Sequence, residues 1–169
     1  MTSACRRTLF PSRAVRRWSV AEKGHHDELG TAAWSAFLRA HAAVVPAIDA
    51  ELRRTTGLPL SWYDVLLELN GAPGRRLRML DLGQRAVISR TRASRVVDEL
   101  VAAGYVSREP NPDDRRSSFA TITQEGRGVF RRAAPRYLEA VRLQFSGRLS
   151  AAQLAAVREA LENVLDGRA

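Results

Sequence analysis

The feature that most constrains this chain is the stretch from Val87 to Ile122, whose pattern predicts a helix, a glycine and two strands joined by a basic turn. The helix is expected to begin at Ser89, whose hydroxyl can accept a hydrogen bond from an unpaired backbone N–H one turn ahead. Gly104 follows the helix, where a left-handed residue is favoured. A capped helix followed by a basic hairpin suits a protein that grips duplex DNA, with the helix in the major groove and the hairpin on the flanking backbone.

The predicted helix has one apolar face and one polar face. Apolar residues recur at the helical period on the face that we expect to be buried, at Ala93, Val96, Val97, Leu100 and Val101. The opposite face carries Thr91, Arg92, Arg95 and Asp98, with Ser94 at its margin. Arginine can bind guanine through two hydrogen bonds, and serine or threonine can bind bases or phosphates. The alternative is an ordinary solvated helix face that is rich in arginine.

The predicted hairpin consists of two short strands, Tyr105–Arg108 and Phe119–Ile122, separated by a long loop of turn-forming residues. Arg115 and Arg116 follow the tip of the loop, and Asp114 can steady one of them through a charge-assisted hydrogen bond. The other arginine can then reach a narrow minor groove, where the negative potential is concentrated. The alternative is a solvated turn with local ion pairs, which contribute only about 0–1 kcal/mol and give little reason for this composition.

The net charge of +9 is distributed unevenly along the 169 residues. Residues 1–24 contain six basic residues and one acidic residue, and they lack the apolar core of a signal peptide. Residues 74–116, which include the predicted helix and hairpin, contain ten basic and six acidic residues. The local excess therefore coincides with the elements expected to meet DNA. Residues 1–26 are expected to be a basic, disordered tail, and the alternative is a flexible arm that contacts phosphates.

Long helices are predicted on both sides of this stretch. The first runs from about Asp27 to Thr55, and Pro46 should kink or break it. Another runs from Glu125 to about Ser146, and a last helix is expected to start at Ser150 with Gln153 completing a capping box. The last helix carries a seam of apolar residues at Leu154, Val157, Leu161 and Val164. Packing within one chain is the alternative, but this seam beside a long apolar first helix fits dimerisation better.

A short helix and a supporting helix are predicted between the first long helix and the basic hairpin. Ser61 is expected to cap the short helix, with Asp64 as its partner in a capping box. The supporting helix should run from Leu80 to Arg85, followed by a turn.

Five runs along the chain form a pattern that is specific in combination, although no single run is. They are Leu77–Gly83, Ile88–Leu100, Ala103–Val106, Pro112–Arg116 and Ile122–Gly126. Together they resemble the MarR (multiple antibiotic resistance regulator) family over roughly residues 29 to 165. The chain departs from the family pattern at Leu80, where a serine or threonine cap usually stands.

The resemblance implies a mainly α fold with a small β-wing, of class α+β, built from a winged helix-turn-helix lobe and a lobe of long dimerisation helices. After the tail, residues 27–169 would form a single domain. Its expected parts are dimerisation helices at 27–56 and 125–166 and a winged helix-turn-helix at 60–124, with the recognition helix at about 89–103 and the wing at about 105–123.

The resemblance also implies a homodimer that binds a pseudo-palindromic operator in double-stranded DNA and regulates transcription, as a repressor released by a small aromatic or lipophilic ligand. The residues expected to read the major groove are Ser89, Thr91, Arg92, Ser94 and Arg95. Arg115 and Arg116 would meet the minor groove and backbone, with Asp114 supporting the wing. A ligand cleft would be lined by Trp34, Phe37, Trp62 and Tyr63, unless these aromatic residues are simply core.

The sequence contains no motif that predicts catalysis. It has no glycine-rich phosphate loop, HExxH, CxxC or GxSxG pattern, and no apolar run long enough to span a membrane. We therefore expect a non-enzyme without cofactor or metal, and the single cysteine suits a cytoplasmic protein. Two alternatives stay open: a nonspecific architectural DNA binder, and a dimeric ligand-binding or interaction protein without sequence readout.

Overall fold

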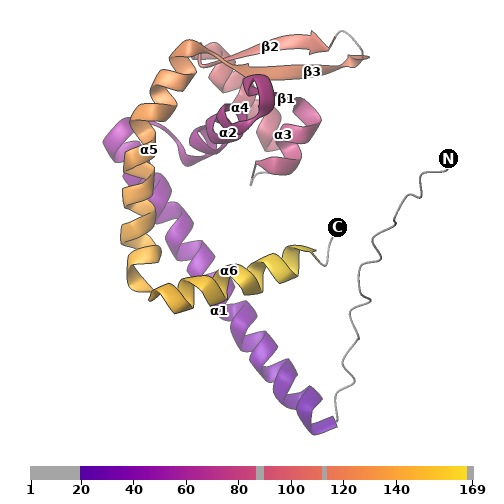
Figure 1. The fold of residues 1–169 in the computed structure, drawn as a ribbon, viewed down its shortest axis with the longest axis vertical. Coiled ribbons are helices and arrows are strands. Elements are labelled where there is room, and N and C mark those ends of the chain that lie inside the picture. The colour runs from indigo at the N-terminus through magenta and orange to yellow at the C-terminus, as the bar shows by residue number, and fades with distance from the viewer. Residues whose placement is uncertain (1–19, 87–89, 112–113, 167–169) are drawn as a thin grey trace, which may run out of the picture. The chain divides into compact units, whose positions relative to one another are not determined.

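The computed structural model describes residues 20–86, 90–111 and 114–166, with side chains at 26–86, 91–111 and 117–166 (Figure 1). The helices are α1 (Val20–Thr56), α2 (Leu60–Gly71), α3 (Met79–Arg85), α4 (Arg90–Ala102), α5 (Gln124–Gln144) and α6 (Ala151–Asp166). Short 3-10 turns cover Pro73–Arg75 and Ser146–Arg148. The strands are β1 (Arg76–Arg78), β2 (Val106–Asn111) and β3 (Asp114–Ile122). The prediction of a mainly α fold with a small sheet, of class α+β, is confirmed.

The first helix is longer than its sequence suggested. It begins at Val20 and continues through Pro46, so the proline does not break it. Proline removes one backbone donor from a helix of 37 residues, and the remaining hydrogen bonds hold the helix on both sides of it. The chain divides into two compact units within this helix; the first unit ends at Ala40 and the second begins at His41.

The core of the second unit gathers side chains from the end of α1, from α2, α3, α4 and α5, and from the sheet. Its most deeply buried members are Leu52, Val65, Leu66, Leu69, Leu82, Val97, Leu100 and Ala120. The predicted buried stripe of α4 is confirmed except at Val101, which is 38% exposed. Val101 lies about 80° around the helix from Ala93, at the edge of the stripe, because each residue turns the helix by about 100°.

The sheet is antiparallel in the order β1-β3-β2, with Leu77 opposite Ala120 and Val106 opposite Ile122. We call the hairpin of β2 and β3 the wing, and Figure 1 shows it lying along one side of α2, α3 and α4. The prediction of a long loop within the wing was wrong, because β2 continues to Asn111 and β3 starts at Asp114. Positions 112 and 113, at the tip, lie outside the described residues.

A buried side chain explains how the wing extends so far. Asn111 is only 1% exposed, and its Nδ2 donates a hydrogen bond of 2.8 Å to Oγ of Ser117. The strand register shifts between Pro110 and Asn111, which turns the asparagine inward. This cross-strand hydrogen bond lies beyond the strand ends that the sequence predicted at Arg108 and Phe119.

The end of α4 follows the predicted chemistry. Gly104 has a φ of +77°, a left-handed conformation that glycine adopts without steric cost. Its N–H donates to the carbonyl of Val101 at 3.0 Å, and the N–H of Tyr105 donates to the carbonyl of Leu100 at 2.9 Å. This pair of bonds satisfies the last carbonyls of the helix and leads the chain directly into β2. The glycine cap thus fixes where the wing begins.

The starts of α5 and α6 are both capped from their own segments. The hydroxyl of Thr123 accepts a hydrogen bond of 3.0 Å from the N–H of Gly126 at the start of α5. At the start of α6, the N–H of Ser150 donates to Oε1 of Gln153 at 2.9 Å, and the N–H of Gln153 donates to Oγ of Ser150 at 3.3 Å. The predicted capping box is confirmed.

None of the helices in the described ranges is long and apolar enough to cross a membrane.

Candidate nucleic-acid interface

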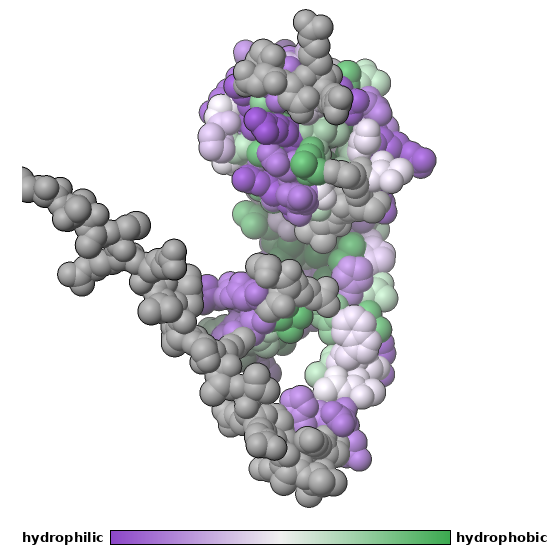
Figure 2. Space-filling model, turned by 90° about the vertical axis from the view of Figure 1, so that its right-hand side faces the viewer, coloured by the Kyte–Doolittle hydropathy of each residue, from purple (hydrophilic) through white to green (hydrophobic). Residues whose placement is uncertain are grey.

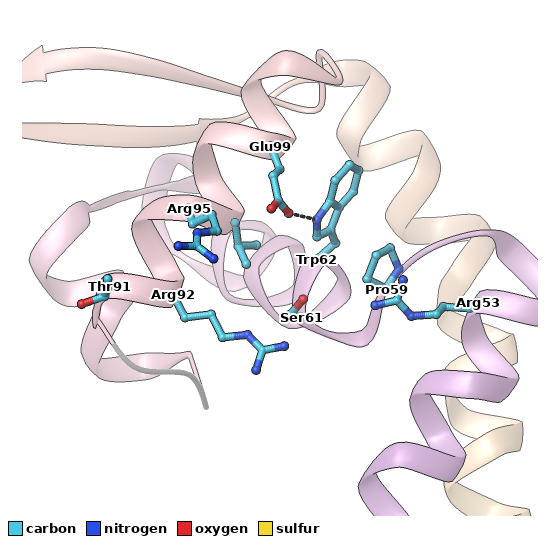
Figure 3. A pocket seen from close by; sticks show the side chains of 9 residues that line it. Arg53, Pro59, Ser61, Trp62, Thr91, Arg92, Arg95 and Glu99 are labelled. Carbon is cyan, nitrogen blue, oxygen red and sulfur yellow. Dashed lines mark hydrogen bonds between the residues drawn. The ribbon is translucent and has the colours of Figure 1, made fainter.

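The outward face of α4 is polar and basic along its first two turns. Because Ala93, Val96 and Val97 turn into the core, Thr91, Arg92 and Arg95 point away from it and are exposed. Figure 3 shows these three side chains on the same side of the helix. The first turn of α4 carries no acid. The first two turns of this face therefore present guanidinium and hydroxyl donors, and no acid of α4 stands among them.

The acids of α4 come one turn later, and both are bound by neighbouring elements. Nη2 of Arg108 on β2 lies 3.1 Å from Oδ1 of Asp98. The indole Nε1 of Trp62 on α2 donates a hydrogen bond of 2.8 Å to Oε2 of Glu99 (Figure 3). Such partly exposed pairs contribute only about 0–1 kcal/mol each. Their main effect is geometric, because they join α4 to the wing on one side and to α2 on the other.

A carboxylate from α1 organises the start of α2 beside this face. Oδ1 of Asp49 accepts a hydrogen bond of 2.7 Å from the N–H of Leu60, the first residue of α2. Its Oδ2 is 2.8 Å from Nε of Arg53. Burial raises the pKa of Asp49, but these two hydrogen bonds together with the charges of Arg53 and Arg92 hold it below its ordinary value. The carboxylate is therefore ionised at neutral pH and lies close to an arginine of α4.

The expectation that Ser61 caps α2 was wrong. The helix begins at Leu60, and the residue before it, Pro59, makes no side-chain cap. The carbonyl of Pro59 instead accepts from the N–H groups of Trp62 and Tyr63 at 3.0 and 3.1 Å. No local pattern marks Asp49 as the cap, because it lies eleven residues earlier on another helix.

A cavity of about 560 Å³ lies between the start of α2 and the outward face of α4 (Figure 3). It is lined by Arg53, Pro59, Ser61, Trp62, Thr91, Arg92, Arg95, Val96 and Glu99. Three guanidinium groups and one carboxylate give this surface a positive balance. The arrangement can bind phosphate or another anion through charge-assisted hydrogen bonds.

Several predicted DNA-contacting side chains lie outside the described residues. They are those of Ser89, Asp114, Arg115 and Arg116, of which the last three have a described backbone at the start of β3. Ser94 is half-buried, as its place at the margin of the stripe predicted.

Sequence reasoning missed two arginines that the structure places on β1, the strand paired with β3 of the wing. The guanidinium groups of Arg76 and Arg78 lie 4.7 and 5.9 Å from the centre of the Phe119 ring. Their alternation around Leu77 in a three-residue strand was the available signal, since alternate residues of a strand share one face. The sheet therefore carries positive charge on β1, beside the wing.

The aromatic residues expected to line a ligand cleft fall into different environments. Trp34 and Phe37 belong to the first compact unit, where their exposed rings stack at 5.7 Å. Trp62 lines the cavity beside α4. Tyr63 is core, stacked on Phe130 at 5.3 Å and on a second tyrosine, and burial raises its pKa to about 12.

Comparison with known proteins places this architecture among DNA-binding regulators. A model of the MarR family matches residues 56–117. Sco3205, a MarR family transcriptional regulator from Streptomyces coelicolor whose crystal structure is in complex with DNA, is 34% identical, with a TM-score of 0.75 over 90% of this chain and 91% of its own. AbsC, a MarR family regulator from the same organism, is 27% identical, with a TM-score of 0.73 over 90% of this chain and 97% of its own.

A shorter match connects the chain to a curated regulator. The HTH-type transcriptional regulator PrsX from Escherichia coli is 34% identical over 70 residues. That match spans 41% of this chain and 42% of PrsX, which is less than half of either protein.

Proposed function

This chain belongs to the MarR family of transcriptional regulators, and from that premise we propose that it is a homodimer that binds a pseudo-palindromic operator and represses transcription. In this proposal α4 enters the major groove and the wing meets the flanking minor groove and backbone. A small aromatic or lipophilic ligand releases the repressor. No enzymatic activity is part of the proposal.

The observation that carries the proposal is the division of α4 into a basic front and an acidic back. Thr91, Arg92 and Arg95 are exposed on its outward face, whereas Asp98 and Glu99 are bound by Arg108 and Trp62. Direct readout of guanine needs guanidinium groups that are exposed and held on a rigid helix. The buried stripe of α4 supplies that rigidity.

The wing supplies a second set of contacts in this proposal. Arg115 and Arg116 follow the tip and would reach the minor groove, with Asp114 supporting one of them. Phosphate contacts of this kind position the protein without reading sequence. Binding through the wing should therefore weaken strongly with salt.

Exposed apolar side chains on the last two helices support a dimer. Leu138 and Leu143 on α5 are 64% and 46% exposed, and Val164 and Leu165 on α6 are 57% and 66% exposed. Figure 2 shows apolar residues, in green, left on the surface among hydrophilic ones. Exposed apolar residues of this size can mark an interaction surface, and in this proposal a second copy covers them. Two copies of α4 could then enter successive major grooves about 34 Å apart.

Release by a ligand would act through a population shift. A ligand that prefers one placement of α4 stabilises that placement at the expense of the one that fits DNA. The polar contacts of α4 with α2 and the wing, at Glu99 and Asp98, are partly exposed, so a ligand bound nearby can shift them.

The first test selects binding sites from a random duplex pool at near-physiological salt. We expect an enriched motif with two-fold symmetry. Arg95→Ala should then weaken binding to that motif by about 1–3 kcal/mol, while Arg131→Ala, which changes an exposed arginine on α5, should not. Tight, salt-sensitive binding without enrichment would instead indicate a nonspecific DNA binder, and failure to retain any DNA would contradict DNA binding altogether.

A further inference from the structure

The end of α4 and the start of α5 are joined through one residue, Thr123. It lies between β3, which ends at Ile122, and α5, which begins at Gln124. Its N–H donates a hydrogen bond of 3.0 Å to the carbonyl of Tyr105, and its Oγ1 donates one of 2.8 Å to the carbonyl of Gly104. Both acceptors belong to the turn that ends α4. Thr123 is therefore bonded through its backbone and its side chain to the exit of the proposed recognition helix.

The same threonine also holds the first turn of α5. Its Oγ1 accepts a hydrogen bond of 3.0 Å from the N–H of Gly126, and its carbonyl accepts one of 3.0 Å from the N–H of Arg127. A hydroxyl has one proton and two lone pairs, so it can donate in one direction and accept from another. One side chain thus links the residues that end α4 to the residues that start α5.

Gly126 allows these two helix ends to come so close. It is buried, and a Cβ at this position would collide with the carbonyl oxygen of Tyr105. That Cβ would also lie 2.9 Å from the carbonyl carbon of Tyr105 and 3.0 Å from Cγ1 of Ile122. A backbone carbonyl cannot swing aside as the end of a long side chain can. Any larger residue at this position must therefore move the start of α5 away from the turn that ends α4.

A second glycine of α5 stands in a different environment. Gly128 is two residues farther along the helix, and a Cβ there would lie 3.3 Å from Nη1 of Arg132. That nitrogen is the end of an exposed, flexible side chain and can shift by a few tenths of an ångström. The two glycines therefore offer a matched pair of sites in one helix, one with a backbone collision and one without.

The angle at this joint matters because α5 is long. Its 21 residues extend over about 30 Å. Two points fix its direction, namely the joint at Thr123 and the core contact of Ala133, which is 1% exposed. Its far half carries Leu138 and Leu143, which a second copy covers in the proposed dimer. Over this length, a change of about 6° at the joint displaces α4 by about 3 Å from the dimer contact, close to the rise of one base pair.

We propose that Thr123 and Gly126 are positioning residues that fix the angle between α4 and α5, and through it the spacing of the two half-sites that the dimer reads. The inference rests on the proposed function, because half-site spacing is a geometric property of a dimer that carries two copies of α4. Neither residue touches DNA in this inference. Their effect is on specificity, because they decide whether the second α4 meets its groove once the first has bound.

The test uses the full chain and the two-fold motif selected from the random pool, and it measures affinity by fluorescence anisotropy at near-physiological salt. The motif is compared with duplexes that have one base pair added or removed between the half-sites. A further duplex carries a single half-site and reports the readout by one α4. We expect the unchanged chain to prefer the selected spacing by at least about tenfold, because a wrong spacing misplaces the second α4.

Gly126→Ala should reduce this spacing preference to less than about threefold and weaken binding to the selected motif by at least about tenfold. Its affinity for the single half-site should change by less than about threefold, because α4 itself is unaltered. Gly128→Ala, the matched control, should keep all of these affinities within about threefold of the unchanged chain. Both variants gain helix propensity, so a general change in α5 cannot account for a difference between them.

A second pair of variants keeps the test decisive if Gly126→Ala does not fold. Thr123→Val keeps the shape of the side chain and removes both hydrogen bonds of its hydroxyl, whereas Thr123→Ser keeps them. We expect the valine variant to lose the spacing preference as Gly126→Ala does. The serine variant should retain its affinity for the selected motif within about threefold.

Full spacing preference in both Gly126→Ala and Thr123→Val would overturn the inference, and so would an equal loss in Gly128→Ala. Loss of single half-site binding in step with the spacing preference would also overturn it, because the residues would then support α4 itself rather than its placement. These outcomes leave the proposed function standing. If the unchanged chain selects no two-fold motif, the proposed function is wrong and the inference falls with it.

Discussion

The helices α2 and α6 begin in different ways, although each has a serine at its start. At α6 the cap is local, because Ser150 and Gln153 bond to each other's backbone N–H groups. At α2 the cap comes from another helix, because Asp49 accepts from the N–H of Leu60. The first arrangement forms whenever α6 forms, whereas the second forms only when α1 and α2 have packed together. The start of α2 is therefore a tertiary contact, and it adjoins the face of α4 that we propose meets DNA.

Among substitutions at the starts of α2 and α6, Asp49→Ala is expected to have the largest effect on stability. This change removes the acceptor for the N–H of Leu60 and the partner of Arg53. We expect the free energy of unfolding to fall by about 2 kcal/mol, because a capping group is lost and a partly buried donor is left unpaired. Urea denaturation measures it. Asp49→Asn keeps an acceptor oxygen and should recover at least half of the loss; equal losses in both variants would show that the charge matters rather than the cap.

A second effect concerns Asp64, which stands where a capping partner of Ser61 would be. Burial, followed by the charge of Glu68, raises the pKa of Asp64 to about 6. A folded-state pKa above the unfolded value means that the folded state binds the additional proton from about pH 4 to 6, so this group lowers stability as the pH rises through that window.

Asp64→Asn should therefore raise the free energy of unfolding at pH 7 by about 1–2 kcal/mol, after allowance for screening by solvent, and change it little at pH 3. Denaturation at the two pH values measures the difference. A carboxylate that capped the helix would behave in the opposite way, with a lowered pKa and a loss of stability at pH 7 on substitution.

Ser150→Ala is expected to have a smaller effect. The change removes the oxygen that accepts from the N–H of Gln153 at the start of α6. We expect a loss of about 0.5–1 kcal/mol, which is at the low end for a helix cap because this turn is exposed. Denaturation measures the loss, and Ser150→Asp should restore it. No change in Ser150→Ala would show that the capping box contributes nothing to stability.

The smallest effect is expected from Ser61→Ala, which changes the serine that makes no cap at α2. The free energy of unfolding should change by less than about 0.5 kcal/mol, as for a typical substitution without a packing or capping role. A loss as large as that of Ser150→Ala would contradict the assignment of the cap to Asp49. Because Ser61 lines the cavity beside α4, operator binding is measured in parallel.

Local features of the fold were predictable from the sequence to the extent that neighbours along the chain determine them. The buried stripe of α4, the left-handed Gly104 and the capping box at Ser150 all depend on residues within a few positions of each other. The length of the wing was not predictable, because it depends on the inward turn of Asn111 and its bond to Ser117 across the strands. Turn-forming residues near the tip predicted shorter strands joined by a long loop.

The candidate site also has features that neighbours along the chain determine and features that depend on distant residues. The exposure of Thr91, Arg92 and Arg95 follows from helical periodicity once the stripe of α4 is buried. The contacts that hold α4 in place do not, because Trp62 and Glu99 are 37 residues apart and nothing in either segment marks the other. The predicted contacts of Arg115 and Arg116 with DNA stay predictions.

Patterns along the chain were enough to predict the types and order of the helices and strands, the polar face of α4 and the family to which the chain belongs. Spacing along one helix or strand fixes which side chains share a face, and that information is local. The cap of α2 by Asp49 and the bond from Trp62 to Glu99 of α4 became visible with the packing of the helices. These features depend on how separate helices pack, where many distant residues compete for the same position and the best-packed arrangement selects among them.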